Sequence, residues 1–239
     1  MFRAKLVFLF AASCLASFGS VIVVPNGNTS TVGNSTDSPD TGDFRVQQLL
    51  GSGQFASVGG SLLIDQLSFR LAPETGSGSL SATNLNLYLS TSPKLPSTIS
   101  TTFADNISPD NTLVFSGPFT ASSSGCTGPA VCPFDLRLNF TTPFLYNPAQ
   151  GSLLLDFKFT GISQTGELDE MDFAGPNGGI VSLVALLNDT TAIDSGFSTD
   201  ILQLRYTAAV PEPTTGAFVF IGAASLALMR RHRSARAAR

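Results

Sequence analysis

The clearest strand signal in this sequence is Ser152-Leu-Leu-Leu-Asp-Phe-Lys-Phe-Thr160. Apolar residues stand at every second position from Leu153 to Phe159, and charged residues alternate with the last of them. Successive side chains of a strand point to opposite faces, so the apolar residues share one face. The stretch therefore predicts a β-strand with one face in a core and the other in water.

The same alternation recurs through the middle of the chain, where Gly, Pro, Ser and Asn separate short apolar runs. Such runs occupy residues 61–71, 85–89, 134–140, 180–187 and 201–206. No helical periodicity is evident between them, and a parallel sheet would need helical crossovers. The pattern predicts an all-β domain over residues 43–209, an antiparallel β-sandwich that is jelly-roll-like. Asn147-Pro148 and Gly151 predict a turn that leads into the strand at Leu153.

The N-terminus has the parts of a secretory signal. Residues 1–5 include two basic side chains, and residues 6–18 form an apolar stretch of the length found in signal peptides. We expect a signal helix over residues 1–20 that is removed near Gly19 or Ser20, although the apolar residues 21–24 obscure the boundary. Residues 21–42 are rich in Ser, Thr and Asn and hold few apolar side chains beyond residue 24, which predicts a disordered linker.

The C-terminus has three parts in a fixed order. Residues 210–213 contain Pro211-Glu212-Pro213, residues 214–229 are apolar, and residues 230–239 are basic, with Arg230, Arg231 and Arg233 as a basic stop. Sixteen residues make a helix about 24 Å long, which is shorter than the roughly 30 Å hydrocarbon core of a bilayer. We expect a single, marginal transmembrane helix with the arginines on the cytoplasmic side and the body outside.

This order of parts resembles the PEP-CTERM sorting signal of exported bacterial proteins. The resemblance implies that an exosortase-type membrane enzyme recognises Pro211, Glu212 and Pro213 and cuts the chain, so that the membrane anchor is transient. The residues themselves leave two alternatives. One is an ordinary anchor that stays in place, and the other is a GPI-anchor signal, which the arginines after the apolar run disfavour. In the body, residues 144–156 and 47–70 also resemble exported PEP-CTERM proteins, but this likeness implies no activity.

The charge of the chain is divided between its ends and its body. All seventeen acidic residues lie from Asp37 to Glu212, and only six basic residues lie among them, so this part has a net charge of −11. Phosphate backbones attract basic surfaces. The acidic body therefore argues against nucleic acid as a partner.

Cys126 and Cys132 are the only cysteines outside the expected signal peptide. In an exported chain we expect them to form a disulfide. A metal site is the alternative, but two thiols without a nearby histidine make a poor ligand set. The third cysteine, Cys14, lies in the apolar stretch of the signal, where a lipidation signal would need a leucine three residues earlier.

Little catalytic chemistry is available to the body. His232 is the only histidine, and it lies in the basic tail, so the body can form no histidine-dependent triad or metal site. Acidic residues cluster instead before the Gly-rich stretch 175–179, and they are Glu167, Asp169, Glu170 and Asp172. A calcium site or a pair of glycosidase carboxylates could be built from them, but no known ligand spacing is met. We therefore expect a solvated loop, with no catalytic residues, no metal and no cofactor.

These observations predict an exported, non-enzymatic protein of the cell surface or extracellular matrix. It would be membrane-anchored before processing, and extracellular polysaccharide is a candidate partner. The alternative is a carbohydrate-binding module, which would show a row of exposed aromatic side chains, with Tyr88 or Tyr146 among them. A secreted carboxylate hydrolase is a third hypothesis, and it requires two acidic side chains that face each other across a cleft.

Overall fold

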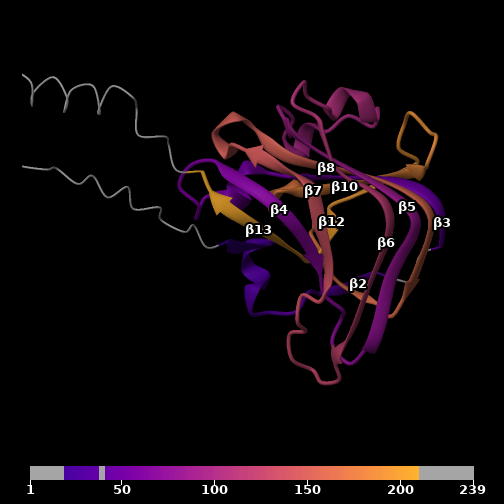
Figure 1. Ribbon diagram of the computed structural model, residues 1–239. Helices are drawn as coiled ribbons and strands as arrows, with labels where there is room; N and C mark the ends of the chain where they lie inside the picture. The colour runs from indigo at the N-terminus through magenta and orange to yellow at the C-terminus, as the bar shows by residue number, and fades with distance from the viewer. Residues whose placement is uncertain (1–18, 38–40, 210–239) are drawn as a thin grey trace, which may run out of the picture. The chain divides into compact units, whose positions relative to one another are not determined.

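A computed structural model describes residues 19–37 and 41–209 of the chain (Figure 1). The regular elements in these ranges are thirteen β-strands and six short 3-10 turns. Every strand pairing in them is antiparallel. The predicted all-β class and antiparallel pairing are confirmed.

The strands form three sheets, in which neighbours in space are often distant in sequence. The four-stranded sheet has the spatial order β1 (Ser20–Val24), β13 (Leu202–Ala208), β4 (Leu62–Phe69) and β7 (Leu136–Tyr146). The six-stranded sheet has the order β11 (Asp194–Gly196), β10 (Ile180–Leu186), β3 (Thr41–Leu50), β8 (Ser152–Thr165), β5 (Gly76–Ser92) and β6 (Thr112–Cys126). The three-stranded sheet has the order β12 (Ser198–Asp200), β9 (Leu168–Asp172) and β2 (Ser35–Asp37).

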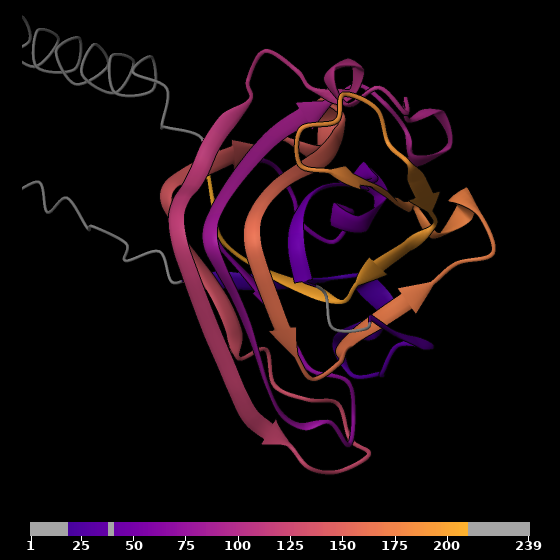
Figure 2. The ribbon, with the colours of Figure 1, turned by 90° about the vertical axis from the view of Figure 1, so that its right-hand side faces the viewer.

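The main core lies between the four-stranded and six-stranded sheets, in a sandwich-like arrangement. Figure 2 shows the long strands of the six-stranded sheet curving around the interior. Ile64 and Leu67 on β4 are fully buried in the same cluster as Leu155 on β8. Burial of such a side chain stabilises the fold by about 1.5–3 kcal/mol. The alternating apolar residues of the sequence thus supply the facing surfaces of the two sheets.

The first half of β8 differs from its prediction because both of its faces are buried. Leu154 is 1 % exposed and Asp156 is 1 % exposed, although both lie on the face that alternation assigns to water. A segment that contains the turns η3 (Pro96–Thr98) and η4 (Phe103–Asn106) covers this part of the sheet. The fold therefore has a partial third layer over the outer face of the six-stranded sheet.

Contacts of Arg45 and Gln47 with Phe103 attach this third layer to the sheet. Arg45 on β3 donates from Nε to Asp156 Oδ1 at 2.8 Å and from Nη2 to Asp156 Oδ2 at 2.6 Å. The Arg45 guanidinium carbon lies 4.3 Å from the centre of the Phe103 ring. Gln47 Nε2 donates to the Phe103 carbonyl oxygen at 3.2 Å. The polar residues of β3 and β8 are therefore used to hold η4 in place.

The prediction of a disordered linker over residues 21–42 is wrong for 21–37 and for 41–42, and residues 38–40 lie outside the described ranges. Strand β1 pairs with β13, and β2 pairs with β9. Val24 is fully buried. Composition measures how much apolar surface a segment can bury by itself, whereas this segment is ordered by backbone pairing with distant strands. The first strand of the folded body thus begins at Ser20, which is the last residue of the predicted signal peptide.

The turn predicted before β8 is present as η5 (Pro148–Gln150). Asn147 Oδ1 accepts a hydrogen bond from the Ala149 amide at 3.0 Å. Gly151 follows with a φ of 154°, and a Cβ at this position would collide with the carbonyl oxygen of Ser92. Glycine is therefore required where the chain enters β8.

Within residues 19–37 and 41–209, no helix is long and apolar enough to cross a membrane. The apolar stretch of the predicted signal helix and the whole predicted transmembrane helix over 214–229 lie outside the described residues.

Candidate functional site

The predicted acidic cluster is split between two environments. Glu170 and Asp172 lie on β9, as does Asp169, and Glu167 is exposed just before this strand. Alternation along β9 turns Asp169 to one face and Glu170 to the other. The expectation of a solvated acidic loop is therefore wrong for Asp169, which is 2 % exposed.

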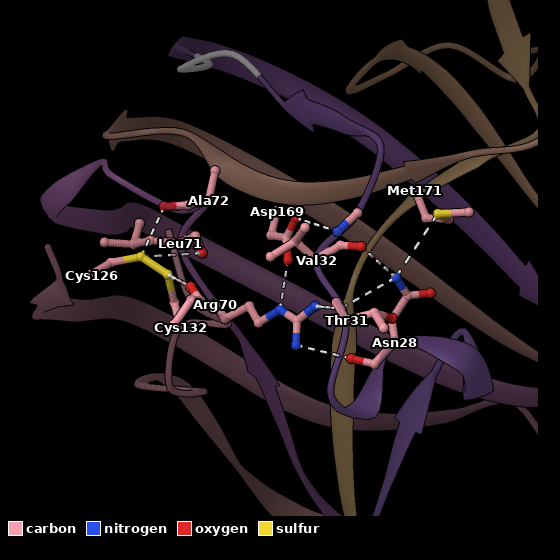
Figure 3. Close-up of polar contacts among 12 residues, drawn as sticks. Asn28, Thr31, Val32, Arg70, Leu71, Ala72, Cys126, Cys132, Asp169 and Met171 are labelled. Atoms are coloured by element: carbon pink, nitrogen blue, oxygen red, sulfur yellow. Dashed lines mark hydrogen bonds and ion pairs between the residues drawn. A yellow bond between two sulfur atoms is a disulfide. The ribbon is translucent and has the colours of Figure 1, made fainter. Parts of the chain in front are cut away.

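Asp169 forms a buried ion pair with Arg70, which directly follows β4 (Figure 3). Arg70 Nε donates to Asp169 Oδ2 at 2.7 Å, and the two side chains are 0 % and 2 % exposed. The other carboxylate oxygen, Oδ1, accepts from the Gly33 amide at 2.9 Å. Burial lowers the pKa of Arg70, and the charge of Asp169 opposes this shift. Both charges are satisfied, so the pair has a structural role.

The remaining donors of Arg70 hold the N-terminal segment. Its Nη1 donates to the Asn28 carbonyl oxygen at 3.0 Å, and its Nη2 donates to the Thr31 carbonyl oxygen at 2.7 Å. Figure 3 shows the guanidinium lying between Asp169 and these two residues. Asn28 is itself buried, and its side-chain amide donates to the Val32 carbonyl oxygen at 3.2 Å. Arg70 thus connects β4, β9 and the segment between β1 and β2.

The predicted disulfide between Cys126 and Cys132 is present. The two Cα atoms are 5.2 Å apart, and the side chains are 2 % and 5 % exposed. Figure 3 shows the bridge beside Leu71 and Ala72, close to Arg70. The disulfide therefore closes a short loop at the end of β6 against the residues that follow β4.

The two tyrosines named for carbohydrate binding lie in different surroundings. Tyr146 is fully buried, where its hydroxyl donates to the Gly151 carbonyl oxygen at 2.8 Å, and burial raises its pKa. Tyr88 is half-buried on β5, with Lys158 Nζ 5.0 Å from its ring centre. The large hydrophobic side chains exposed in the described ranges are all aliphatic. The row of exposed aromatic side chains that would favour a carbohydrate-binding module is therefore absent from this part of the chain.

A cavity of about 150 Å³ lies where the three-stranded sheet meets the six-stranded sheet. Its apolar wall comes from β3, β4 and β8, and includes Phe44, Val46, Phe69, Phe157 and Phe159. Its polar wall includes Glu170 of β9, with Asp37 of β2 and Asp200 of β12 from the strands on either side. The cavity therefore combines an aromatic surface with an acidic one.

Among the carboxylates of the cavity, Glu170 has a pKa that the folded protein raises. Partial burial raises the pKa of Glu170, and the negative charge of Asp172 raises it further. Hydrogen bonds with Ser198 and Ser35 act in the opposite direction. The protein therefore makes the charged form of Glu170 less favourable than it is in water.

Gln48 on β3 belongs to the lining of the same cavity and has an unsatisfied side-chain group. The residue is 6 % exposed, and its side-chain oxygen Oε1 has no hydrogen-bond partner among the described residues. In the sequence, Gln48 belongs to the stretch 47–70 that resembles exported PEP-CTERM proteins, but that resemblance assigns it no role in a site. Its spacing of two from Val46 is the available signal that it faces the interior.

No group of three or more His, Cys, Asp or Glu side chains in the described ranges could hold a metal ion. Both parts of the predicted sorting site lie beyond these ranges, and they are the motif Pro211, Glu212 and Pro213 and the arginines Arg230, Arg231 and Arg233. Comparison of the chain with models of known protein families finds no match, and comparison with curated proteins finds none either.

Proposed function

We propose that this chain is an exported, non-enzymatic protein of the cell surface or extracellular matrix, sorted by an exosortase-type membrane enzyme. The observation that carries the proposal is the order of the C-terminal parts. Strand β13 ends at Ala208, and the Pro211-Glu212-Pro213 motif, the apolar residues 214–229 and the arginines follow directly after it. In this proposal the body is a jelly-roll-like sandwich that serves as the cargo.

Two properties of the body support export. The disulfide between Cys126 and Cys132 is consistent with an oxidising compartment outside the cytoplasm. The net charge of −11 between Asp37 and Glu212 suits a protein kept in solution by its own charge. Extracellular polysaccharide is the proposed surrounding, and nucleic acid is not a proposed partner.

The side-chain arrangement supports a role without catalysis. The only histidine of the chain is His232, so the body has no imidazole for acid–base chemistry. The hydrolase alternative needs two acidic side chains that face each other across a cleft, and of the predicted acidic cluster only Glu170 lines the cavity, together with Asp37 and Asp200. Asp169 is instead committed to Arg70, and neighbouring Glu170 points to the opposite face of β9.

The experiment is intact-mass analysis of the exported protein from a host that has an exosortase. We expect the chain to end near Pro213 and to begin near Ser20. A Glu212→Ala variant should remain uncut, whereas Glu167→Ala, which removes an exposed acidic residue of the body, should be processed as the unaltered chain is. Recovery of the full-length tail in the membrane of that host would contradict the proposal.

A further inference from the structure

The unsatisfied amide oxygen of Gln48 indicates that the cavity receives a hydrogen-bond donor. Leaving a buried amide group without its hydrogen bond costs about 1–3 kcal/mol, and native proteins keep few such groups. Gln48 Oε1 is buried, has no partner among the described residues and belongs to the lining of the cavity. A molecule bound in the cavity would supply the missing donor.

The charge of the lining specifies the kind of donor. The cavity has the carboxylates of Asp37, Glu170 and Asp200 in its wall, and no Lys, Arg or His among the described residues that line it. Carboxylates and the amide oxygen are hydrogen-bond acceptors. A positively charged donor would be attracted by this wall. It would also stabilise the charged form of Glu170, which burial makes unfavourable.

The apolar wall specifies what the donor is attached to. The rings of Phe44 and Phe159 lie 5.2 Å apart, and those of Phe157 and Phe159 lie 5.7 Å apart, so the wall is a continuous aromatic surface. Aromatic faces attract cations and hydrocarbon groups. A bare metal ion would make no use of this wall. At about 30 Å³ for each water-sized group, the cavity has room for about five such groups.

We propose that this cavity binds a small organic ammonium ion, with the nitrogen at Glu170 and Gln48 and the apolar body against Phe44 and Phe159. The inference concerns the folded body and does not depend on how the chain is sorted. The same chemistry is offered by free aliphatic amines and by the amino sugars of polysaccharides.

Isothermal titration calorimetry on the full-length chain, purified in detergent micelles, tests the ligand class with two matched pairs. The first pair is n-butylammonium and n-butanol, and the second is glucosamine and glucose. We expect at least one ammonium compound to bind at least tenfold more tightly than its neutral partner. The pair that shows the larger difference identifies an aliphatic amine or an amino sugar as the source. Equal binding within both pairs, or no binding at millimolar concentration, overturns the proposal.

Two variants with matched controls locate the site. Glu170→Gln should weaken binding of the ammonium compound at least tenfold, whereas Glu167→Gln makes the same charge change at an exposed position and should stay within twofold. Val184→Lys should also weaken binding at least tenfold, because Val184 lines the cavity and is 37 % exposed, so the new ammonium group can enter it. Leu186→Lys, on the same strand and 62 % exposed, should stay within twofold. Equal losses in a variant and its control would show a general charge effect and overturn the assignment.

Discussion

Arg70 Nε and Asp169 Oδ2 lie 2.7 Å apart where neither side chain is more than 2 % exposed. Arg205 Nε and Asp65 Oδ1 are separated by the same 2.7 Å, but these side chains are 39 % and 38 % exposed. The chain thus contains two ion pairs of equal length that differ in burial. Water screens the second pair, whereas the first is surrounded by protein.

Because the two ion pairs differ in burial, removing the carboxylate should lower the free energy of unfolding by different amounts. Asp169→Ala leaves a buried guanidinium without its partner and should lower the free energy of unfolding by about 3–5 kcal/mol. Asp65→Ala should lower it by less than about 1 kcal/mol. Urea unfolding followed by far-ultraviolet circular dichroism measures both, because the chain has no tryptophan to serve as a fluorescent probe. Equal losses in the two variants would contradict the difference in burial.

The burial of residues on β1 predicts how strongly substitutions in this strand lower the free energy of unfolding. Val24 is fully buried on β1, so Val24→Asp should lower the free energy of unfolding by about 3 kcal/mol or more. Val21 is 55 % exposed on the same strand, and Val21→Asp should change it by less than about 1 kcal/mol. The same urea experiment distinguishes these variants. A harmless Val24→Asp would mean that β1 is not part of the folded body.

Removal of the disulfide should lower the free energy of unfolding modestly. The bridge between Cys126 and Cys132 closes a loop with a sequence separation of 6, and chain entropy assigns such a loop about 2 kcal/mol. Non-reducing peptide mapping should recover the two cysteines in one peptide, joined to each other by a disulfide. Cys126→Ser combined with Cys132→Ser should fold, with a free energy of unfolding lower by about that amount. Free thiols in the folded, unaltered protein would be the opposite result.

Glu170 predicts a dependence of stability on pH. Its pKa is raised in the folded chain, so the folded state holds the proton more tightly than the unfolded state, whose glutamates titrate at about 4.3. Stability contributed by the protonated form is complete below about pH 4.3 and is lost as the pH rises through the raised value. Glu170→Gln has no such loss, so its stability relative to the unaltered chain should increase from about pH 4 to about pH 7. Carbon-13 NMR of the carboxyl group, assigned with this variant, checks the direction of the shift. Titration at or below the ordinary value would disprove it.

The strands themselves were predictable because their signal is local. Period-two alternation around Leu153 and around Ile64 requires only neighbouring residues, and Asn147 and Gly151 specify a turn by their own conformational preferences. The disulfide was predictable because only two cysteines remain outside the expected signal peptide. In each case the information lies within a short stretch or in a simple count.

The remaining features depend on residues far apart in the sequence. Asp156 is buried because the segment with η4 covers β8. The alternation of residues within β8 does not predict this covering segment. Arg70 meets Asp169 across 99 positions of sequence. Glu170 faces the cavity because β9 pairs with β2 on one side, where Ser35 lies opposite it. The cavity is therefore a product of strand pairing and has no sequence motif of its own.

The pairing of β1 with β13 brings the two ends of the body to one corner. Ser20, the first residue of β1, lies opposite Tyr206, two residues before β13 ends at Ala208. Residues opposite each other in an antiparallel pair have Cα atoms about 4.5–5.5 Å apart. A linker of a few residues could join these ends and allow a circularly permuted body with no strand interrupted. For the same reason, attaching the body to a bead or a surface by either end would leave the same faces free.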